Sequence, residues 1–95
     1  MKNDMSFVGI LGKTPRVKMW EFFLLSRGNF EYNIKKLAKA TNITRPTCYK
    51  ELEELMKRKI IIKGQKHRGK QLYKLNKNLE VVKAMLQAFH KLIYS

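Results

Sequence analysis

The chain has 95 residues, of which 44% are hydrophobic, enough apolar content for one small folded domain and too much for a disordered chain. Lys and Arg number 21 against 7 Asp and Glu, which gives a formal net charge of +14 at pH 7. This excess indicates a polyanionic partner, nucleic acid ahead of an anionic membrane surface. One Cys and two His cannot form a Cys/His zinc site or an intramolecular disulfide, so we expect no metal and no cofactor.

The N-terminal residues 1–13 begin polar and turn apolar at Phe7, and glycines at positions 9 and 12 interrupt any helical pattern. We interpret them as an arm. No cleavable signal peptide is visible, and no apolar run approaches the ~18 residues of a spanning helix. We therefore expect a soluble, cytoplasmic protein without membrane contact.

Two helices are predicted in the first half of the chain. Thr14 and Pro15 form a start signal for a helix that continues to Gly28. Asn33 begins a second helix, whose segment IKKLAKAT leaves its lysines on the outer face. A tight turn at Asn42 follows.

A third helix is predicted over residues 45–59, with Thr44 as its cap. Cys48, Leu52 and Leu55 are spaced i, i+4 and i+7 and form one inward face. The residues left exposed at the start of this helix are the ones available to contact a partner. We expect the acidic residues further along to pair with cations of the same helix.

The next segment predicts a β-hairpin. Residues 60–63 and 71–75 are expected to be strands, and the segment between them is expected to be a long, projecting loop. Between Leu55 and Leu79 every charged residue is Lys or Arg, apart from His67, and no carboxylate interrupts the run.

The last helix is predicted to start at Asn78. Its apolar residues are spaced by three and four, as in the seam of a coiled coil, which predicts a homodimer. The predicted dimer contacts are Leu79, Val82, Leu86, Phe89 and Ile93.

These elements predict a mainly α fold with a small β-hairpin, in the order α-α-α-β-β-α. Two short helices joined by a turn and followed by a basic hairpin are typical of a winged helix-turn-helix. The chain would form one structural domain, divided into the arm (1–13), the DNA-binding part (14–76) and a C-terminal dimerisation helix (77–95). The third helix would read bases in the major groove through Arg45, Pro46, Thr47 and Lys50. Contacts to the DNA backbone, or to the minor groove in the case of Arg68, would come from Thr44, Tyr49, Lys35, Lys36, Lys63, Lys66, His67, Arg68 and Lys70.

Three segments carry a resemblance to a known family: LGKTPRVKMWEFFL, IKKLAKATNITRPTCYKELEELMKRKII and LYKLNKNLEVVKAMLQAF. They resemble the small archaeal winged helix-turn-helix regulators related to the ArsR and MarR groups. The resemblance implies a homodimer that pairs through its terminal helices and a sequence-specific transcription regulator, commonly a repressor. It transfers no effector ligand, because the clustered Cys or His of the metal sensors are not present here.

The leading interpretation is a double-stranded DNA-binding regulator rather than an enzyme, since no catalytic motif is visible. Two alternatives remain open. One is a small basic RNA-binding protein, which a shortage of exposed stacking aromatics disfavours. The other is an architectural or partition protein that coats DNA without controlling a promoter. The sequence indicates neither the operator nor an effector.

Overall fold

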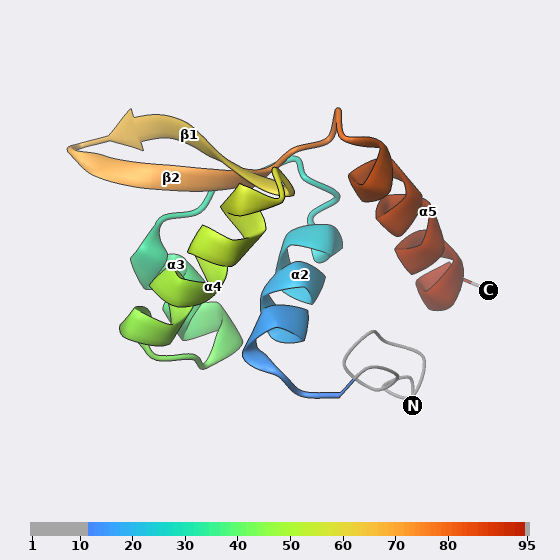
Figure 1. The fold of residues 1–95 in the computed structure, drawn as a ribbon, viewed down its shortest axis with the longest axis horizontal. Helices are drawn as coiled ribbons and strands as arrows, with labels where there is room; N and C mark the ends of the chain where they lie inside the picture. The colour runs from blue at the N-terminus through green and yellow to red at the C-terminus, as the bar shows by residue number, and fades with distance from the viewer. Residues whose placement is uncertain (1–11, 95) are drawn as a thin grey trace.

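The computed structural model describes the backbone of residues 12–94 and the side chains of residues 12–92. In this range the chain forms four helices and a two-stranded antiparallel hairpin in the order α-α-α-β-β-α, as predicted (Figure 1). No helix in the described range is long and apolar enough to cross a bilayer. Nearly all of the predicted arm, 1–13, lies outside the described residues, as does the side chain of Ile93. The elements are α2 (Pro15–Leu25), α3 (Ile34–Thr41), α4 (Arg45–Lys57), β1 (Ile61–His67), β2 (Lys70–Leu75) and α5 (Glu80–Tyr94).

Local hydrogen bonds explain where the first two helices begin. The Thr14 hydroxyl accepts from the backbone N–H of Val17 at 3.2 Å, and the Asn33 side chain accepts from that of Lys36 at 2.8 Å. Each bond satisfies a backbone donor that the helix itself leaves unpaired. Asn42 ends α3 in the left-handed conformation, with φ 58°, as the sequence predicts.

The start of α5 differs from the prediction. The helix begins at Glu80, and the backbone carbonyl of Leu79 accepts its first hydrogen bond, from Lys83, at 3.0 Å. Asn78 lies instead in the preceding turn, where its backbone N–H donates to the Asn76 side chain at 3.3 Å. The prediction that Asn78 caps this helix is therefore wrong by one residue.

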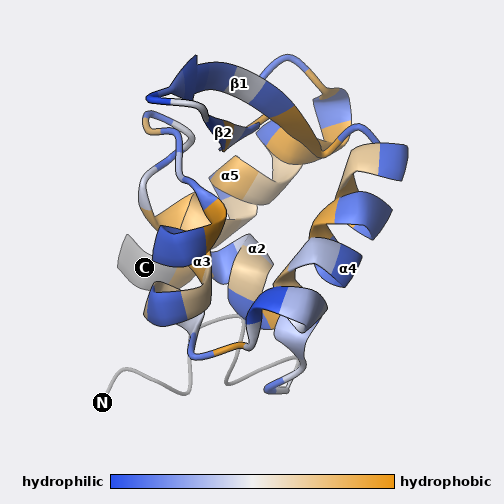
Figure 2. Cartoon of the chain, turned by 90° about the vertical axis from the view of Figure 1, so that its left-hand side faces the viewer, coloured by the Kyte–Doolittle hydropathy of each residue, from blue (hydrophilic) through white to orange (hydrophobic). Residues whose placement is uncertain are grey.

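The core lies where α2, α3 and α4 meet the base of the hairpin. Met19, Phe23, Leu37, Leu52 and Ile61 are fully buried there. Figure 2 shows the consequence for the hairpin: β1 is hydrophobic at the end next to α4 and hydrophilic over the rest of its length. The hairpin is thus anchored at one end, while its other end extends beyond the helices.

A short backbone pairing attaches the segment between α2 and α3 to the hairpin. The backbone N–H of Tyr32 donates to the carbonyl of Tyr73 at 2.9 Å, and the N–H of Tyr73 donates back at 2.8 Å. The Tyr32 ring also packs on Phe22 and Phe23, with centroids 4.7 and 5.7 Å away. This bridge links β2 to the helical layer, so the hairpin and the start of α3 keep a defined relation to each other.

Candidate nucleic-acid interface

The start of α4 separates buried from exposed side chains as the sequence predicts. Cys48, Leu52 and Leu55 have no exposed surface, so the inward face is confirmed. Four of the predicted contact residues near the start of the helix are exposed on its outer side: Arg45, Pro46, Tyr49 and Lys50.

Thr44 and Thr47 lie differently from the other predicted contacts. Thr44 occupies the cap position of α4, yet its side chain makes no capping hydrogen bond. Its hydroxyl instead donates to the Thr47 hydroxyl at 3.1 Å, and Thr47 is half-buried. Thr44 is therefore the cap residue by position, as predicted, but its hydroxyl pairs with that of Thr47 instead of bonding the helix backbone.

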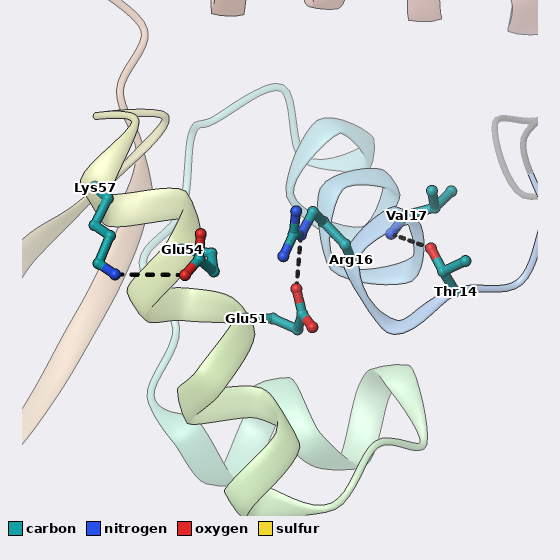
Figure 3. A network of polar contacts seen from close by, with 6 residues as sticks. All are labelled: Thr14, Arg16, Val17, Glu51, Glu54 and Lys57. Carbon is teal, nitrogen blue, oxygen red and sulfur yellow. Dashed lines mark hydrogen bonds and ion pairs between the residues drawn. The ribbon is translucent and has the colours of Figure 1, made fainter.

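An ion pair between helices neutralises one acid of α4. The Arg16 guanidinium of α2 donates to the Glu51 carboxylate at 2.7 Å (Figure 3). The hydrogen bond and the charge of Glu51 raise the pKa of Arg16. Sequence reasoning paired the acids with cations of α4 itself, which holds for Glu54 and Lys57 at 3.5 Å but not for Glu51. The Arg16 contact fastens α4 to α2 and keeps the Glu51 charge away from the exposed start of the helix.

The hairpin is longer and better ordered than predicted. β1 continues to His67 and β2 begins at Lys70, so the expected loop is strand except for a two-residue turn at Arg68 and Gly69. Both turn residues have positive φ, 53° and 78°, the combination found in the tight type I′ turn that connects neighbouring strands. The predicted loop is therefore too long, although the end of the hairpin projects as expected. The cations along the hairpin are held on paired strands, and Lys63, Lys66, His67, Arg68 and Lys70 are all exposed.

Glu31 is a structural residue that sequence reasoning missed. Its carboxylate accepts from the backbone N–H of Gln65 at 2.9 Å and lies 3.9 Å from the Lys74 ammonium. The contact falls where the strand register shifts, between Lys63 and Lys66. A Cβ added at Gly64 would overlap the Glu31 carboxylate, so a larger residue there would displace Glu31 from its bond to Gln65. No local signal could have found this contact, because its partners are 34 positions apart in the chain.

A surface groove of about 280 Å³ brings several of the predicted residues together. Lys35 from α3, Arg45 and Tyr49 from α4 and Lys70 from β2 line it. Asn33, Gln71 and Tyr73 also line it and were not predicted. Burial raises the pKa of Tyr73, and the neighbouring Tyr49 adds to the rise. None of the described residues that line this groove is a carboxylate; its exposed side chains include the cations and the phenol of Tyr49, whereas Tyr73 is buried.

The remaining predicted contacts lie outside this groove. Lys36 is exposed on α3, Pro46 and Lys50 on α4, and Lys63, Lys66, His67 and Arg68 on the hairpin and its turn. None of these residues forms part of the wall of the groove.

The predicted dimer seam is largely occupied by the chain itself. Val82 and Phe89 are only 2% and 6% exposed, because α5 packs them against the core of its own chain. Leu79 and Leu86 are half-buried against the same core. Val82 and Phe89 are therefore corrected from contacts with a second copy to core residues. Val81, which was not predicted, remains 47% exposed on the same helix.

Cys48 lies in a fully buried setting. Its thiol is 3.9 Å from the backbone carbonyl of Ile43, and burial raises its pKa, so the unreactive protonated thiol is favoured. Among the described residues no group of three or more His, Cys, Asp or Glu could hold a metal ion.

The element order and the exposed start of α4 agree with the predictions from the residue pattern. Comparisons with protein-family models, curated proteins and solved structures found no match to this chain.

Proposed function

We propose that the chain is a winged helix-turn-helix protein that binds double-stranded DNA and regulates transcription. The groove between α3, α4 and the hairpin carries the proposal, because it gathers Lys35, Arg45, Tyr49 and Lys70 from three elements and no described carboxylate lines it. In this arrangement α4 enters the major groove, about 12 Å wide, with Arg45 as the main base-reading residue.

The hairpin serves as the wing in this proposal. Its anchored base and projecting basic end are suited to the phosphates beside the site of α4, and Arg68 stands at the tip, where a minor groove would lie. Phosphate contacts set affinity and make it salt-dependent, whereas base contacts set sequence preference. Lys63, Lys66 and Lys70 belong to the first class and Arg45 to the second.

A pair of single substitutions separates these two roles. A bound sequence is first selected from a random duplex pool, and binding to it is compared with binding to scrambled duplex. We expect Arg45→Ala to weaken specific binding by about 1–3 kcal/mol and to affect scrambled duplex much less. We expect Lys66→Ala to weaken both equally and to reduce the slope of log K against log salt by about 0.9.

Three outcomes would contradict the proposal. Equal losses for Arg45→Ala and Lys66→Ala would show that α4 does not read bases. Failure of the pool to yield a preferred sequence would leave only coating of DNA, the architectural alternative. Preference for structured RNA over duplex DNA in competition at matched salt would move the assignment to RNA binding.

We further propose that the regulator acts as a homodimer, so that two copies of α4 reach half-sites about one helical turn apart. Val81 and Ala88 are exposed on α5, while Met85 and Leu92 are half-buried, and these residues are spaced by three and four along one flank of the helix. This apolar flank, free of charged residues, suits a second copy of the same helix, which meets it with the same apolar residues. It replaces the predicted seam, whose central residues are used within the chain.

A further inference from the structure

Tyr73 is almost completely buried, yet no group in the described part of the chain hydrogen-bonds its hydroxyl. The side chain is 7% exposed and lines the groove between α3, α4 and the hairpin. Its backbone is fixed, because the N–H donates to the Tyr32 carbonyl at 2.8 Å and the carbonyl accepts from the Tyr32 N–H at 2.9 Å. Buried hydroxyls normally have a partner, so a donor held this firmly without one points to a ligand.

The Tyr73 hydroxyl opens into the groove and is not sealed in the core. Among the described residues, the side-chain polar atom that is both fully buried and without a partner is Nε1 of Trp20, not the Tyr73 oxygen. Burial and, to a smaller extent, the charge of an ionised Tyr49 raise the pKa of Tyr73. Tyr73 is therefore a neutral donor at ordinary pH, and the influence of Tyr49 indicates that the two phenol oxygens share the space of the groove.

Cations without an acidic partner flank the two phenols. Lys35, Arg45 and Lys70 line the groove from three elements, and all three are exposed. The ion pairs of the described chain use other cations, and no described residue that lines the groove is a carboxylate. The Asn33 oxygen accepts from the Lys36 N–H, which leaves its NH2 group without a described partner. Donors and positive charge thus converge on one place.

From this arrangement we infer that the groove is a phosphate site, in which the Tyr73 hydroxyl donates to a phosphate oxygen while Lys35 and Lys70 neutralise the charge. A phosphate has several acceptor oxygens, so it can accept from a phenol and from two ammonium groups at once. An apolar ligand would leave the hydroxyl unpaired, and a cationic ligand would meet like charges. Arg45 remains available for the proposed base contact.

The phosphate group has two possible sources, the backbone of a DNA duplex and a free phosphorylated small molecule. With the first source, the inference rests on the proposed function and adds Tyr73 to its contacts. With the second source, it is independent of DNA. The experiments below distinguish the two.

Tyr73→Phe removes the hydroxyl and keeps the ring. We expect this variant to bind the selected duplex about tenfold more weakly, as when a hydrogen bond to a charged group is lost. The unfolding free energy in urea should not fall, because the hydroxyl has no described partner to lose. Tyr32→Phe is the matched control, since it removes a phenol that does not line the groove and should leave duplex binding unchanged.

A neutral analogue of the phosphate identifies its source. Single methylphosphonates are placed at each backbone position of the selected duplex. If the duplex supplies the phosphate, one position per half-site should weaken binding by the wild-type protein and cost Tyr73→Phe much less, because hydroxyl and phosphate form one contact. Inorganic phosphate, titrated at constant ionic strength, should shift the backbone amide resonances of Lys70 and Gln71, with about tenfold weaker affinity in Tyr73→Phe.

The outcomes separate this inference from the proposed function. Tyr73→Phe that binds both duplex and inorganic phosphate as the wild-type protein does would overturn the inference, even if Arg45→Ala and Lys66→Ala differ as expected. Weaker binding accompanied by a lower unfolding free energy would also overturn it, because Tyr73 would then be structural. A response to inorganic phosphate without coupling to any methylphosphonate would assign the site to a free phosphorylated molecule. Failure to bind any duplex would contradict the proposed function alone, since inorganic phosphate still tests the groove.

Discussion

Neighbouring residues at the start of α4 have opposite environments, and this contrast underlies the proposed interface. Cys48 is fully buried, while Tyr49 beside it is 50% exposed. Successive residues of a helix are rotated by about 100°, so the neighbour of a buried residue can lie on the exposed side. Which residues can meet a partner is thus decided by which of their neighbours must be buried.

The buried thiol gives a pH dependence that can be measured. Burial raises the pKa of Cys48 above its ordinary value of 9.0, so the unfolded chain releases this proton before the folded chain does. The contribution of Cys48 to stability is therefore fully present below that value and is lost as the pH rises past it. We expect the unfolding free energy of the wild-type protein to fall more steeply between about pH 8 and pH 10 than that of Cys48→Ser.

Urea titrations of both proteins at each pH make the comparison. Serine keeps the approximate size and does not titrate in this range, and the surface lysines and tyrosines are common to both chains. Parallel curves for the two proteins would show that Cys48 keeps its ordinary pKa in the folded state.

At the scale of elements, the hairpin shows how a polar segment can be ordered without a hydrophobic pattern. Gly64 to Lys70 contains no large apolar side chain, yet backbone pairing with β2 orders its strand residues and Glu31 binds the bulge. The two-residue turn then places Arg68 at the tip. Main-chain hydrogen bonds, rather than burial of side chains, therefore fix the backbone that carries these cations.

The turn predicts an unusual combination of effects for one substitution. Asparagine adopts the left-handed conformation more readily than arginine, and Asn-Gly is a preferred pair in this turn. We expect Arg68→Asn to raise the unfolding free energy by up to about 1 kcal/mol. If Arg68 contacts a phosphate, the same change should reduce the salt slope of DNA binding by about 0.9.

Gly69→Ala is the control for the conformational part. A Cβ there would meet no described atom within 4 Å, yet the φ of 78° strains any residue other than glycine, so we expect lower stability and an unchanged salt slope. Denaturant unfolding and DNA titrations at several salt concentrations measure both quantities. A loss of stability in Arg68→Asn equal to that in Gly69→Ala would contradict the two-residue turn.

Over the whole molecule, the surfaces proposed for DNA binding and for self-association lie on different helices. Figure 1 places α3, α4 and the hairpin together, with α5 on the far side of α2. The proposed DNA contacts lie on the first group, and the exposed part of α5 points away from it. DNA binding and self-association can therefore use separate surfaces of the same small domain.

The proposed dimer is tested by a charge on the apolar flank of α5. We expect Val81→Glu to yield monomers in sedimentation equilibrium at concentrations where the wild-type protein is dimeric, because a carboxylate would be buried without a partner. Gln87→Glu is the control, since it adds the same charge to another side of the helix and should remain dimeric. A monomeric wild-type protein at tens of micromolar, or a dimeric Val81→Glu, would contradict the interface.

The sequence by itself determined the features that depend on residues within about one helical turn of each other. The Thr14 and Asn33 caps, the left-handed Asn42 and the inward face of α4 all follow from local hydrogen bonds and helical periodicity. The element order followed from these signals, as did the set of exposed cations.

Only the tertiary structure decided the features that join distant segments. The pairing that turns the expected loop into strand, the Arg16–Glu51 contact and the Glu31 bond to Gln65 bring together groups far apart in the chain. The apolar residues of α5 are another example. Their spacing of three and four residues predicts that one face of the helix is buried, but it does not indicate whether the same chain or a second copy covers that face. Packing of α5 on α2 settled that choice for Val82 and Phe89.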